Sequence, residues 1–305
     1  MRTAFIDTLY ELASRDERIW LLCGDLGFSV LENFAQNFPN RYVNVGVAEQ
    51  NMTGVAAGLA LSGKIVFTYS IANFPVMRCL EQIRNDVCAH NLNVKIVSVG
   101  GGFAYGSAGY THHGTEDLAI MRVLPNMTVL APGDPYEARL LTIAATERAG
   151  PCYLRLGKAG EPTIHTSQPN IIIGKAIALR DGDDGTLIST GATLGMAMKA
   201  ASELSERGVS VSVLSMPSLA PLDKDALLHA AKNTGRIVTV ENHGLGGLGS
   251  AVAEVLAASS IHPRFAAMYL QARPATVAGS EAAMYASHDL SPTTIAAKMM
   301  SLMSS

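Results

Sequence analysis

Among the acidic residues of this chain, Glu49 stands where an acid could take part in catalysis. It follows the apolar segment 45–48 (Val-Gly-Val-Ala) at an expected turn between a strand and a helix. Partial removal of water from such an acid favours its neutral form, which can donate a proton or a hydrogen bond. The helix behind it, at 48–61, is rich in Gly and Ala, so another element is expected to pack very close to it. The alternative is an ordinary first-turn glutamate that complements the helix dipole, and the position alone does not decide between the two.

Two neighbouring histidines form a second group that could do chemistry. His112 and His113 lie in a Gly-rich loop, 100–113, which follows an expected strand ending at Val99. Open α/β sheets bind their ligands at the carboxyl ends of their strands, which is where this loop begins. The alternative is a pair of ordinary solvated side chains.

One aromatic and two basic residues follow other expected strands. Phe74 comes after the strand at 64–69, and its ring could fill the core or stack against a ligand. Arg155 and Lys158 end the first expected domain, where basic side chains are ordinarily solvated. Lys would offer an anion a point charge rather than the two-pronged group of Arg.

Short apolar runs alternate with longer helical patterns in the first half of the chain. The runs are β-branched and bounded by Gly, Asp or Pro, as buried parallel strands are. They lie at 19–22, 65–67, 94–99 and 127–130, and helices are expected near 48–61, 76–90, 115–122 and 134–148. Asp134 and Pro135 are the expected cap and first-turn proline of the last helix. This alternation predicts a parallel sheet with helices on both faces.

The alternating pattern is lost at 157–174 and then restarts. Gly and Pro punctuate a polar stretch there, which predicts an interdomain linker. Further strands are expected near 186–190, 209–214, 236–240 and 264–270, with helices near 194–207, 223–233 and 246–258. We therefore predict an α/β protein with two doubly wound parallel-sheet domains, at 1–160 and 181–305, joined by a linker at 161–180.

The composition is that of a globular protein without a basic face. The 305 residues are 48% hydrophobic and 16% charged, and the net charge is −3, which argues against nucleic-acid binding. The four cysteines are far apart and form no C-x-x-C pair, which favours buried reduced thiols over zinc or disulfides. No apolar run reaches the roughly 20 residues of a membrane helix. The N-terminus lacks the pattern of a signal or transit peptide, so we expect a soluble, cytoplasmic protein.

Two stretches resemble ligand loops but lack what such loops require. Residues 244–249 spell G-x-G-x-x-G after a strand, yet the next strand runs into 271–273 (Gln-Ala-Arg) without the acidic residue of a dinucleotide site. Residues 181–185 (D-G-D-D-G) lack the downstream ligands of a calcium loop and indicate a solvated turn. We predict no metal ligands in this chain.

Four ordered motifs point to a family. Residues 45–51 resemble the Gly-(Ile/Val)-x-Glu signature of thiamine diphosphate enzymes. The segments 81–85, 109–113 and 121–127 resemble transketolases in the same order. The resemblance covers nearly the whole chain and corresponds to the C-terminal half of a transketolase. It implies a pyrimidine-binding domain followed by the smaller transketolase C-terminal domain.

The resemblance implies roles toward the cofactor for three residues. Glu49 would hydrogen-bond the aminopyrimidine of thiamine diphosphate and promote its imino form. Phe74 would stack on the aminopyrimidine ring, and Tyr69 would do so if the alignment shifts by one residue. The cofactor would serve as the electron sink for carbon–carbon cleavage.

The resemblance also implies roles toward the substrate. His112 corresponds to a substrate-contacting histidine and would bind or polarise a substrate oxygen. Lys158 would grip the acceptor phosphate, with Arg155 as a second substrate-binding cation.

The magnesium and diphosphate motif of the family is missing. No segment supplies the G-D-G sequence with its following Asn pair, and carboxylate and carbonyl ligands at fixed spacing are what a magnesium-held diphosphate needs. Since the chain opens at Met1 with a helical pattern, we expect a natural split subunit. The resemblance implies a partner that resembles the N-terminal half of transketolase and holds the diphosphate and Mg²⁺. The expected assembly is a heterotetramer with each active site at a subunit interface.

Three departures from the family concern the substrate. Ala108 stands where transketolases have an Asp that contacts a sugar hydroxyl, and Gly100 occupies the region of a phosphate-contacting histidine. His113 replaces a Gln. We therefore expect that the acceptor end of the pocket is not the standard one for a pentose phosphate. A different sugar, a sulfonated or branched sugar, and a carrier-bound acyl group remain open, and the sequence alone does not identify the acceptor.

The expected reaction is transfer of a two-carbon ketol unit from a ketose to an aldehyde. The alternative is a beta-type subunit of a 2-oxoacid dehydrogenase or a deoxyxylulose-phosphate-synthase-like enzyme, which shares the Glu and the two-domain plan. A non-catalytic relic is a third possibility, since fold alone does not establish activity.

Overall fold

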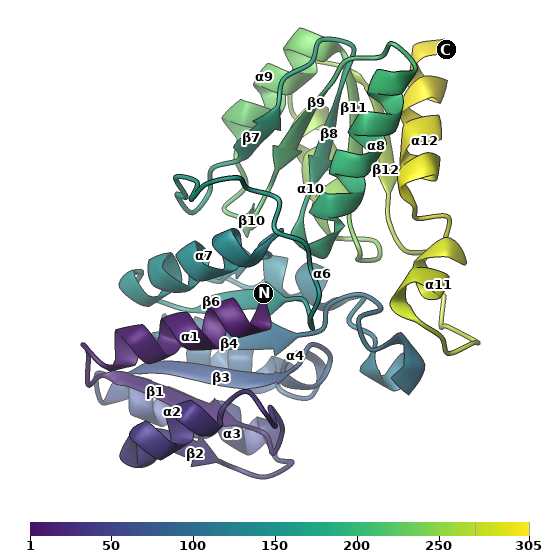
Figure 1. Ribbon diagram of the computed structural model, residues 1–305. Coiled ribbons are helices and arrows are strands. Elements are labelled where there is room, and N and C mark those ends of the chain that lie inside the picture. The colour runs from purple at the N-terminus through teal and green to yellow at the C-terminus, as the bar shows by residue number, and fades with distance from the viewer. Residues whose placement is uncertain (272, 305) are drawn as a thin grey trace.

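Two sheets, one for each half of the chain, form the framework of the protein. The computed structural model describes residues 1–271 and 273–304 (Figure 1). The first sheet has seven strands in the order β10-β5-β6-β4-β3-β1-β2, and the second has five in the order β12-β11-β8-β9-β7. Among the described strands, neighbours pair in parallel except at two edges, where β10 runs antiparallel to β5 and β7 to β9. The prediction of an α/β fold with two mostly parallel sheets is confirmed.

The central strands are buried along their whole length. The first sheet consists of β1 (Ile19–Cys23), β2 (Tyr42–Asn44), β3 (Ile65–Ile71), β4 (Val94–Val99), β5 (Thr128–Leu130), β6 (Cys152–Leu156) and β10 (Ser218–Ala220). The second consists of β7 (Ile177–Arg180), β8 (Gly185–Ser189), β9 (Val211–Ser215), β11 (Arg236–Val240) and β12 (Arg264–Met268). Every residue of β4 and β6 is buried, because helices cover both faces. This burial explains why these strands appear in the sequence as continuous runs.

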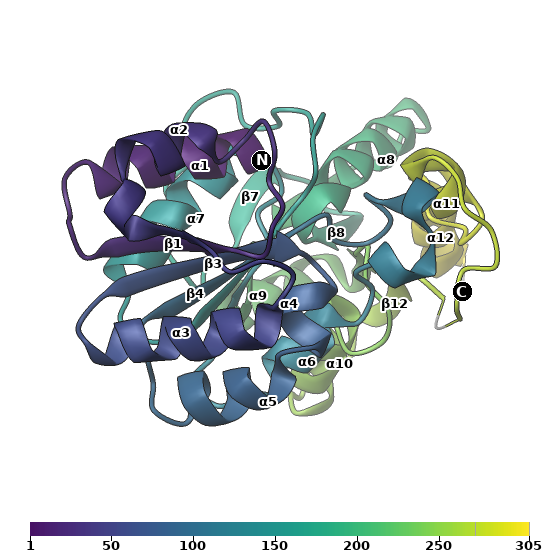
Figure 2. The same ribbon diagram turned by 90° about the horizontal axis from the view of Figure 1, so that it is seen from below.

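Helices lie on both faces of the first sheet (Figure 2). One face carries α1 (Arg2–Ala13), α2 (Glu32–Asn37) and α7 (Pro135–Glu147), and the other carries α3 (Glu49–Leu61), α4 (Phe74–Met77), α5 (Leu80–Gln82) and α6 (Asp117–Arg122). The carboxylate of Asp134 accepts the N–H of Glu137 at 2.8 Å and Pro135 opens α7, as predicted. The helix predicted at 76–90 is instead a series of short turns, in which a π-helical turn at Ile83–Cys88 follows α5. Such π turns often accompany functional sites.

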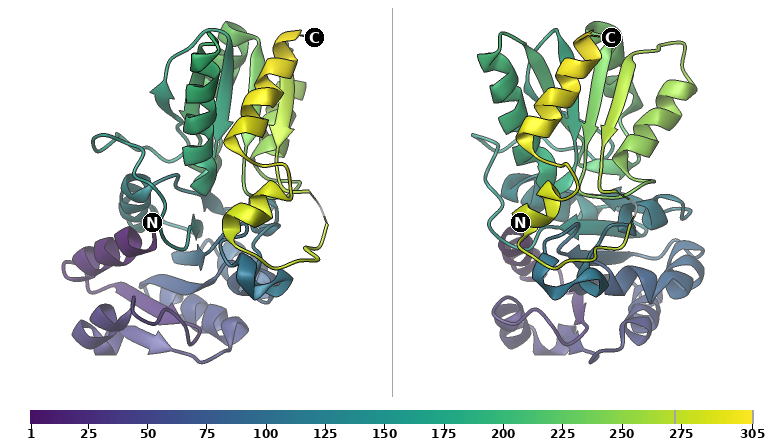
Figure 3. Two further views of the ribbon diagram at one scale, coloured as in Figure 1. Left: turned by 45° about the vertical axis from the view of Figure 1, so that its right-hand side comes forward. Right: turned by 90° about the vertical axis from the view of Figure 1, so that its right-hand side faces the viewer.

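The second sheet is also covered on both faces. Its helices are α8 (Leu194–Glu206) and α12 (Pro292–Ser304) on one face and α9 (Lys224–Thr234) and α10 (Leu248–Ala257) on the other (Figure 3). The short α11 (Glu281–Ala286) and the segment before it reach down to the loop at 100–113, where Gly279 donates its N–H to the carbonyl of Gly106 at 3.4 Å. The two halves therefore meet beside the loop that carries the histidines.

Two edge strands cross the expected domain division. The strand β10 comes from the second half of the chain but pairs with β5 in the first sheet. The strand β7 lies inside the segment 161–180, where a linker was expected, and it pairs with β9. Strands of three and four residues show too little pattern to be detected in the sequence. No helix in the described part of the chain has the length and hydrophobicity needed to cross a membrane.

Candidate active site

Glu49 is the first residue of α3 and lies directly after the turn that follows β2. Gly46 makes that turn in a left-handed conformation (φ 72°), which favours glycine. The Glu49 side chain is nearly inaccessible, at 3% exposed. Its Oε2 accepts a hydrogen bond from Nη1 of Arg78 at 3.0 Å, and its Oε1 lies 3.5 Å from Oγ of Ser70 at the end of β3. The carboxylate is thus fixed at the carboxyl end of the first sheet.

The burial of Glu49 agrees with the expected removal of water, but polar side chains and not its apolar sequence neighbours contact the carboxylate. Val47, two positions away, is 73% exposed. The groups that contact the carboxylate, Ser70 and Arg78, lie 21 and 29 positions away in the sequence. The neighbours of a turn residue in sequence need not be its neighbours in space.

Phe74 and Arg78 lie face to face beside this carboxylate. The guanidinium carbon of Arg78 is 4.4 Å from the centroid of the Phe74 ring, a cation–π contact between residues four apart. The ring of His112 meets Phe74 edge-on, with centroids 5.2 Å apart and planes at 71°. Arg78, which the sequence analysis missed, thus connects Glu49 with Phe74, and Phe74 in turn contacts His112. The spacing of Phe74 and Arg78 at i and i+4 was the one signal that could have indicated it.

Tyr69 does not belong to this site. Its side chain is 1% exposed and stacks on Phe5 of α1, with centroids 6.2 Å apart and planes at 17°. Side chains alternate along a strand, so Ser70 faces Glu49 and Tyr69 faces the opposite side of the sheet. Tyr69 is a core residue, and the hypothesis that it stacks on a cofactor is wrong.

The two histidines of the loop have different environments. His112 is partly exposed, and its Nδ1 lies 3.0 Å from Oγ1 of Thr111. His113 is buried, and its ring meets that of Phe103 edge-on at 4.9 Å. Burial lowers the pKa of His113, and this effect outweighs the Gly106 backbone, which favours the protonated ring. His113 is therefore a neutral imidazole at neutral pH.

Lys158 lies over the face of an aromatic ring. Its side chain is exposed, and Nζ lies 4.6 Å from the centroid of the Tyr105 ring. The Tyr105 ring lies 6.5 Å from that of His112, so one aromatic side chain connects the cation with the histidine loop. The Tyr105 ring packs on Gly100, whose φ of 84° and lack of a side chain make room for it. The histidine that the family has in this region would not fit beside that ring.

Arg155 is buried and fully engaged, unlike the substrate-binding residue that was expected. Its Nε donates to Oδ2 of Asp117 at 2.7 Å, and its Nη1 donates to Oδ1 of Asn242 at 2.5 Å. Its Nη2 donates to the carbonyls of Gly114 and Asn242 at 2.7 and 3.0 Å. Since Asn242 follows β11 of the second sheet, Arg155 connects the two halves of the protein. This guanidinium has no nitrogen left for a substrate.

A hollow of about 320 Å³ opens beside these residues. We call it the Phe74 hollow, and it is lined by Asn73, Phe74, Met77, Arg78, Tyr110, Thr111, His113 and Glu116. It combines ring faces with a small number of polar groups, as binding sites for small molecules do.

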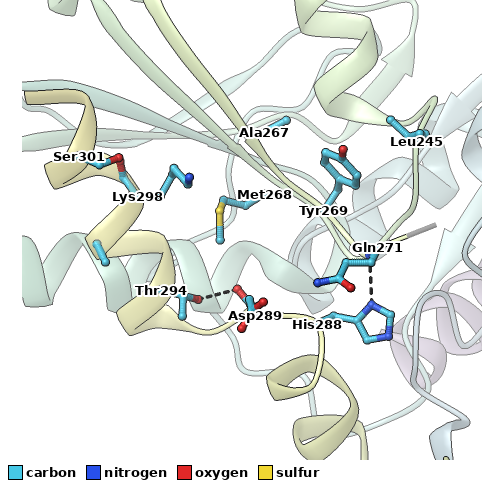
Figure 4. A pocket seen from close by; sticks show the side chains of 11 residues that line it. Leu245, Ala267, Met268, Tyr269, Gln271, His288, Asp289, Thr294, Lys298 and Ser301 are labelled. Atoms are coloured by element: carbon cyan, nitrogen blue, oxygen red, sulfur yellow. Dashed lines mark hydrogen bonds between the residues drawn. The ribbon is translucent and has the colours of Figure 1, made fainter. Parts of the chain in front are cut away.

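A larger hollow, of about 630 Å³, lies elsewhere, between β12 and α12 (Figure 4). In it, Nδ1 of His288 accepts the N–H of Gln271 at 3.1 Å, and the carbonyl of Asp289 accepts the hydroxyl of Thr294 at 2.8 Å. None of the residues that carry the four sequence motifs lines it. The candidate active site is therefore the one at Glu49 and not this larger hollow.

Comparison with known proteins identifies the family. Residues 1–160 match the family described as transketolase, pyrimidine binding domain, and residues 174–295 match transketolase, C-terminal domain. The chain belongs to the transketolase family. It is 41% identical to an apulose-4-phosphate transketolase subunit of Phocaeicola vulgatus, over 86% of this chain and 85% of that protein. It is also 41% identical to the 6-deoxy-6-sulfo-D-fructose transketolase subunit SqwH of Clostridium sp., over 84% and 80%.

One solved structure resembles this chain over nearly its whole length. The structure called "Split gene transketolase, inactive beta4 tetramer" matches with a TM-score of 0.90 and 36% identity, over 99% of this chain and 97% of that one. A 1-deoxy-D-xylulose-5-phosphate synthase of Desulfotalea psychrophila is 36% identical over 85% of this chain but only 41% of its own length. The predicted identity, a C-terminal subunit of a split transketolase acting as a ketol transferase, is confirmed by the relatives of matching length.

The residues beside Glu49 fit the thiamine diphosphate that a pyrimidine-binding domain implies. The planar guanidinium of Arg78 lies on the Phe74 ring and donates a hydrogen bond to Glu49. A planar group with a hydrogen-bonding edge is therefore accommodated between this ring and this carboxylate. The same two features, a ring face and an edge that pairs with an acid, characterise an aminopyrimidine.

Proposed function

We propose that this chain supplies Glu49 to the active site of a split transketolase, in which a second subunit holds the diphosphate of thiamine diphosphate and its Mg²⁺. The reaction would move a two-carbon ketol unit from a ketose to an aldehyde. The observation that carries the proposal is the buried Glu49 carboxylate at the start of α3. Beside it lies the face of the Phe74 ring, which the planar guanidinium of Arg78 covers.

Each residue of the site has a role in this proposal. Glu49 exchanges a proton or hydrogen bond with the aminopyrimidine, and Phe74 sets the plane of that ring through its face. His112, edge-on to Phe74, binds or polarises a substrate oxygen. When bound, thiamine diphosphate supplies the electron sink for cleaving a carbon–carbon bond next to a carbonyl. The protein's share is to hold these groups in place and keep water away.

An uncovered face of α3 supports the need for a partner subunit. Gly54, Val55, Gly58 and Leu61 are exposed along α3, and no atom lies within 4 Å of where a side chain at Gly54 or Gly58 would begin. We call these four residues the α3 face. Glycines let a second backbone approach closely, and exposed Val55 and Leu61 would gain from being covered. We infer that the partner packs here, close to Glu49, in a heterotetramer. The inactive tetramer of the related beta chain is consistent with an incomplete site in this subunit alone.

Arg78 must leave Glu49 when the aminopyrimidine arrives. Glu49 is buried, but the cofactor would take the place of Arg78 on the carboxylate and water would hydrate the 49% exposed Arg78 side chain. We therefore expect the exchange to cost only about 0.2–1 kcal/mol. Arg78→Met is therefore expected to tighten cofactor binding by the assembled enzyme about two- to five-fold. Calorimetric titration of cofactor into the assembled variant checks this, with Arg84→Met, an exposed neighbour, as the control. Weaker cofactor binding by Arg78→Met would show that this residue holds the cofactor instead of occupying its place.

Lys158 is proposed to hold an anionic group of the acceptor. Lys158→Ala is expected to raise KM for anionic acceptors by roughly 10- to 100-fold, because a charge-assisted contact is lost. A neutral acceptor such as glycolaldehyde should respond little, and kcat at saturation should hold if the contact is the same in ground and transition states. Steady-state kinetics with both kinds of acceptor test this, with exposed Lys199→Ala as the control. Wild-type KM values for every anionic acceptor would show that Lys158 is only a solvated side chain.

The proposed function is tested by reconstitution. The chain is mixed with its diphosphate-binding partner, thiamine diphosphate and Mg²⁺, and transfer from a ketose to aldehydes is followed by mass spectrometry. Ketol transfer by the mixture, but by neither subunit alone, is expected. Release of carbon dioxide from pyruvate, without ketol transfer, would instead support a synthase or dehydrogenase.

A further inference from the structure

His113 is a buried imidazole that lies near the backbone of Gly106 but makes no hydrogen bond of good geometry with any described residue. Its side chain is 1% exposed, and within the described part of the chain neither ring nitrogen makes a hydrogen bond. Buried polar groups in proteins are nearly always paired, because an unpaired one costs stability. An exception therefore calls for an explanation in terms of function.

A second unpaired polar atom belongs to another residue that lines the same hollow. Nδ2 of Asn73 donates to the carbonyl of Thr111 at 2.9 Å, which fixes the orientation of the amide. Its Oδ1 is buried and, among the described residues, accepts no hydrogen bond. Asn73 precedes α4 and His113 ends the histidine loop, yet both line the Phe74 hollow.

The two side chains offer complementary hydrogen-bonding groups. A neutral imidazole carries one donor and one acceptor, and the amide oxygen of Asn73 is an acceptor. Together they match a hydroxyl group, which both donates and accepts. Phe103 and Tyr110 hold the His113 ring edge-on, at 4.9 and 6.3 Å between centroids, so its orientation is set by packing.

We propose that His113 and Asn73 bind a hydroxyl group of the aldehyde acceptor and select acceptors that carry it. This inference rests on the proposed function, since it names a substrate feature read by the same site. Both polar atoms are enclosed, and Tyr110, which packs on His113 and is 46% exposed, would turn aside to admit the acceptor.

The departures from the family agree with this assignment. Ala108 is exposed and has no polar side chain, and Gly100 is covered by the Tyr105 ring. Two positions that contact the substrate in the family, 100 and 108, therefore carry no polar side chain in this protein. His113, which replaces a Gln, supplies a polar side chain to the lining of the Phe74 hollow. A site built to hydrogen-bond a hydroxyl discriminates strongly against an analogue that lacks it, because its buried groups are then left unpaired.

The test combines enzyme variants with acceptors that lack single hydroxyls. The assembled enzyme is assayed with glyceraldehyde, 3-hydroxypropanal (no hydroxyl at C2) and lactaldehyde (no hydroxyl at C3). We expect His113→Leu to lower kcat/KM by about 10- to 100-fold for acceptors that carry the contacted hydroxyl. The acceptor that lacks this hydroxyl should be affected less than threefold, and His113→Gln should restore most of the loss. Asn73→Ser should show the same selectivity and serves as the second variant if His113→Leu folds poorly.

A control variant and two further outcomes decide whether the inference holds. His262→Leu, an exposed histidine of the second half, is the control and should match the wild type. An equal loss of kcat/KM with all three acceptors would show that His113 only supports the loop. An unchanged kcat/KM would show that His113 binds no hydroxyl group of the acceptor. If the wild-type assembly transfers ketol units to aldehydes, these results bear on the hydroxyl site alone. If it transfers none, the proposed function fails and this inference fails with it.

Discussion

Glu49→Gln is expected to lower ketol transfer by the assembled enzyme by about 10²–10⁴-fold, the usual contribution of a positioned acid or base. Gln keeps the length and hydrogen-bonding capacity of the side chain but cannot exchange a proton. The fold should be retained, because Arg78, the partner of the carboxylate, is half exposed and can be hydrated by water. A loss of this size with normal folding would identify Glu49 as a catalytic acid.

Three measurements make this result interpretable. Turnover is measured on the assembled enzyme, thermal unfolding on the isolated chain, and cofactor affinity by calorimetry on the assembly. Glu81→Gln, an exposed glutamate of another family motif, is the matched control. If Glu49→Gln keeps even a tenth of the activity with normal cofactor binding, the assignment of Glu49 is wrong.

Gly58→Leu is expected to abolish assembly with the partner subunit while the chain itself stays folded. The position is open in the isolated chain, since no atom beyond the adjoining residues and the local backbone of α3 lies within 4 Å of an added Cβ. Replacing an exposed helical glycine should even stabilise α3, by roughly 0.5–1 kcal/mol. A bulky side chain on the α3 face would nevertheless prevent close approach of a partner. Activity should then fall to the level of the unpaired chain.

Size-exclusion chromatography with light scattering of the mixed subunits measures this assembly. Ser202→Leu places the same side chain on exposed α8 and should assemble normally. Normal assembly and activity of Gly58→Leu would mean that the partner binds elsewhere and that the α3 face is merely solvated.

Much of the fold could be predicted because its parallel strands are buried on both faces. Runs such as β4 consist of apolar residues bounded by turn residues, and α7 begins with a recognisable Asp-Pro pair. The strand β10 was missed, because pairing with β5 is decided by tertiary contacts and not by three residues of sequence. The break of the helix predicted at 76–90 into α4, α5 and a π turn has no signature that we recognised.

The candidate site was predictable where a motif carries the residue and not where burial decides its role. Glu49, Phe74 and His112 follow from the family resemblance, and in the structure they are linked through Arg78. Arg155 was misjudged: it lies inside the buried strand β6, between apolar residues, which is a sign of a buried ion pair rather than a solvated cation. The sequence does not reveal that Arg78 contacts Glu49, or that Asn73 and His113 have unpaired buried atoms, because both depend on the folded arrangement.

Cofactor binding by the separate and mixed subunits is the most direct test of the central claim that this chain holds half of a thiamine diphosphate site. Thiamine diphosphate with Mg²⁺ is titrated calorimetrically into this chain, into its partner and into their mixture. The account predicts negligible binding to this chain alone and stoichiometric binding to the mixture, lost again when Gly58→Leu replaces the wild type. Tight, stoichiometric binding by this chain alone would contradict it.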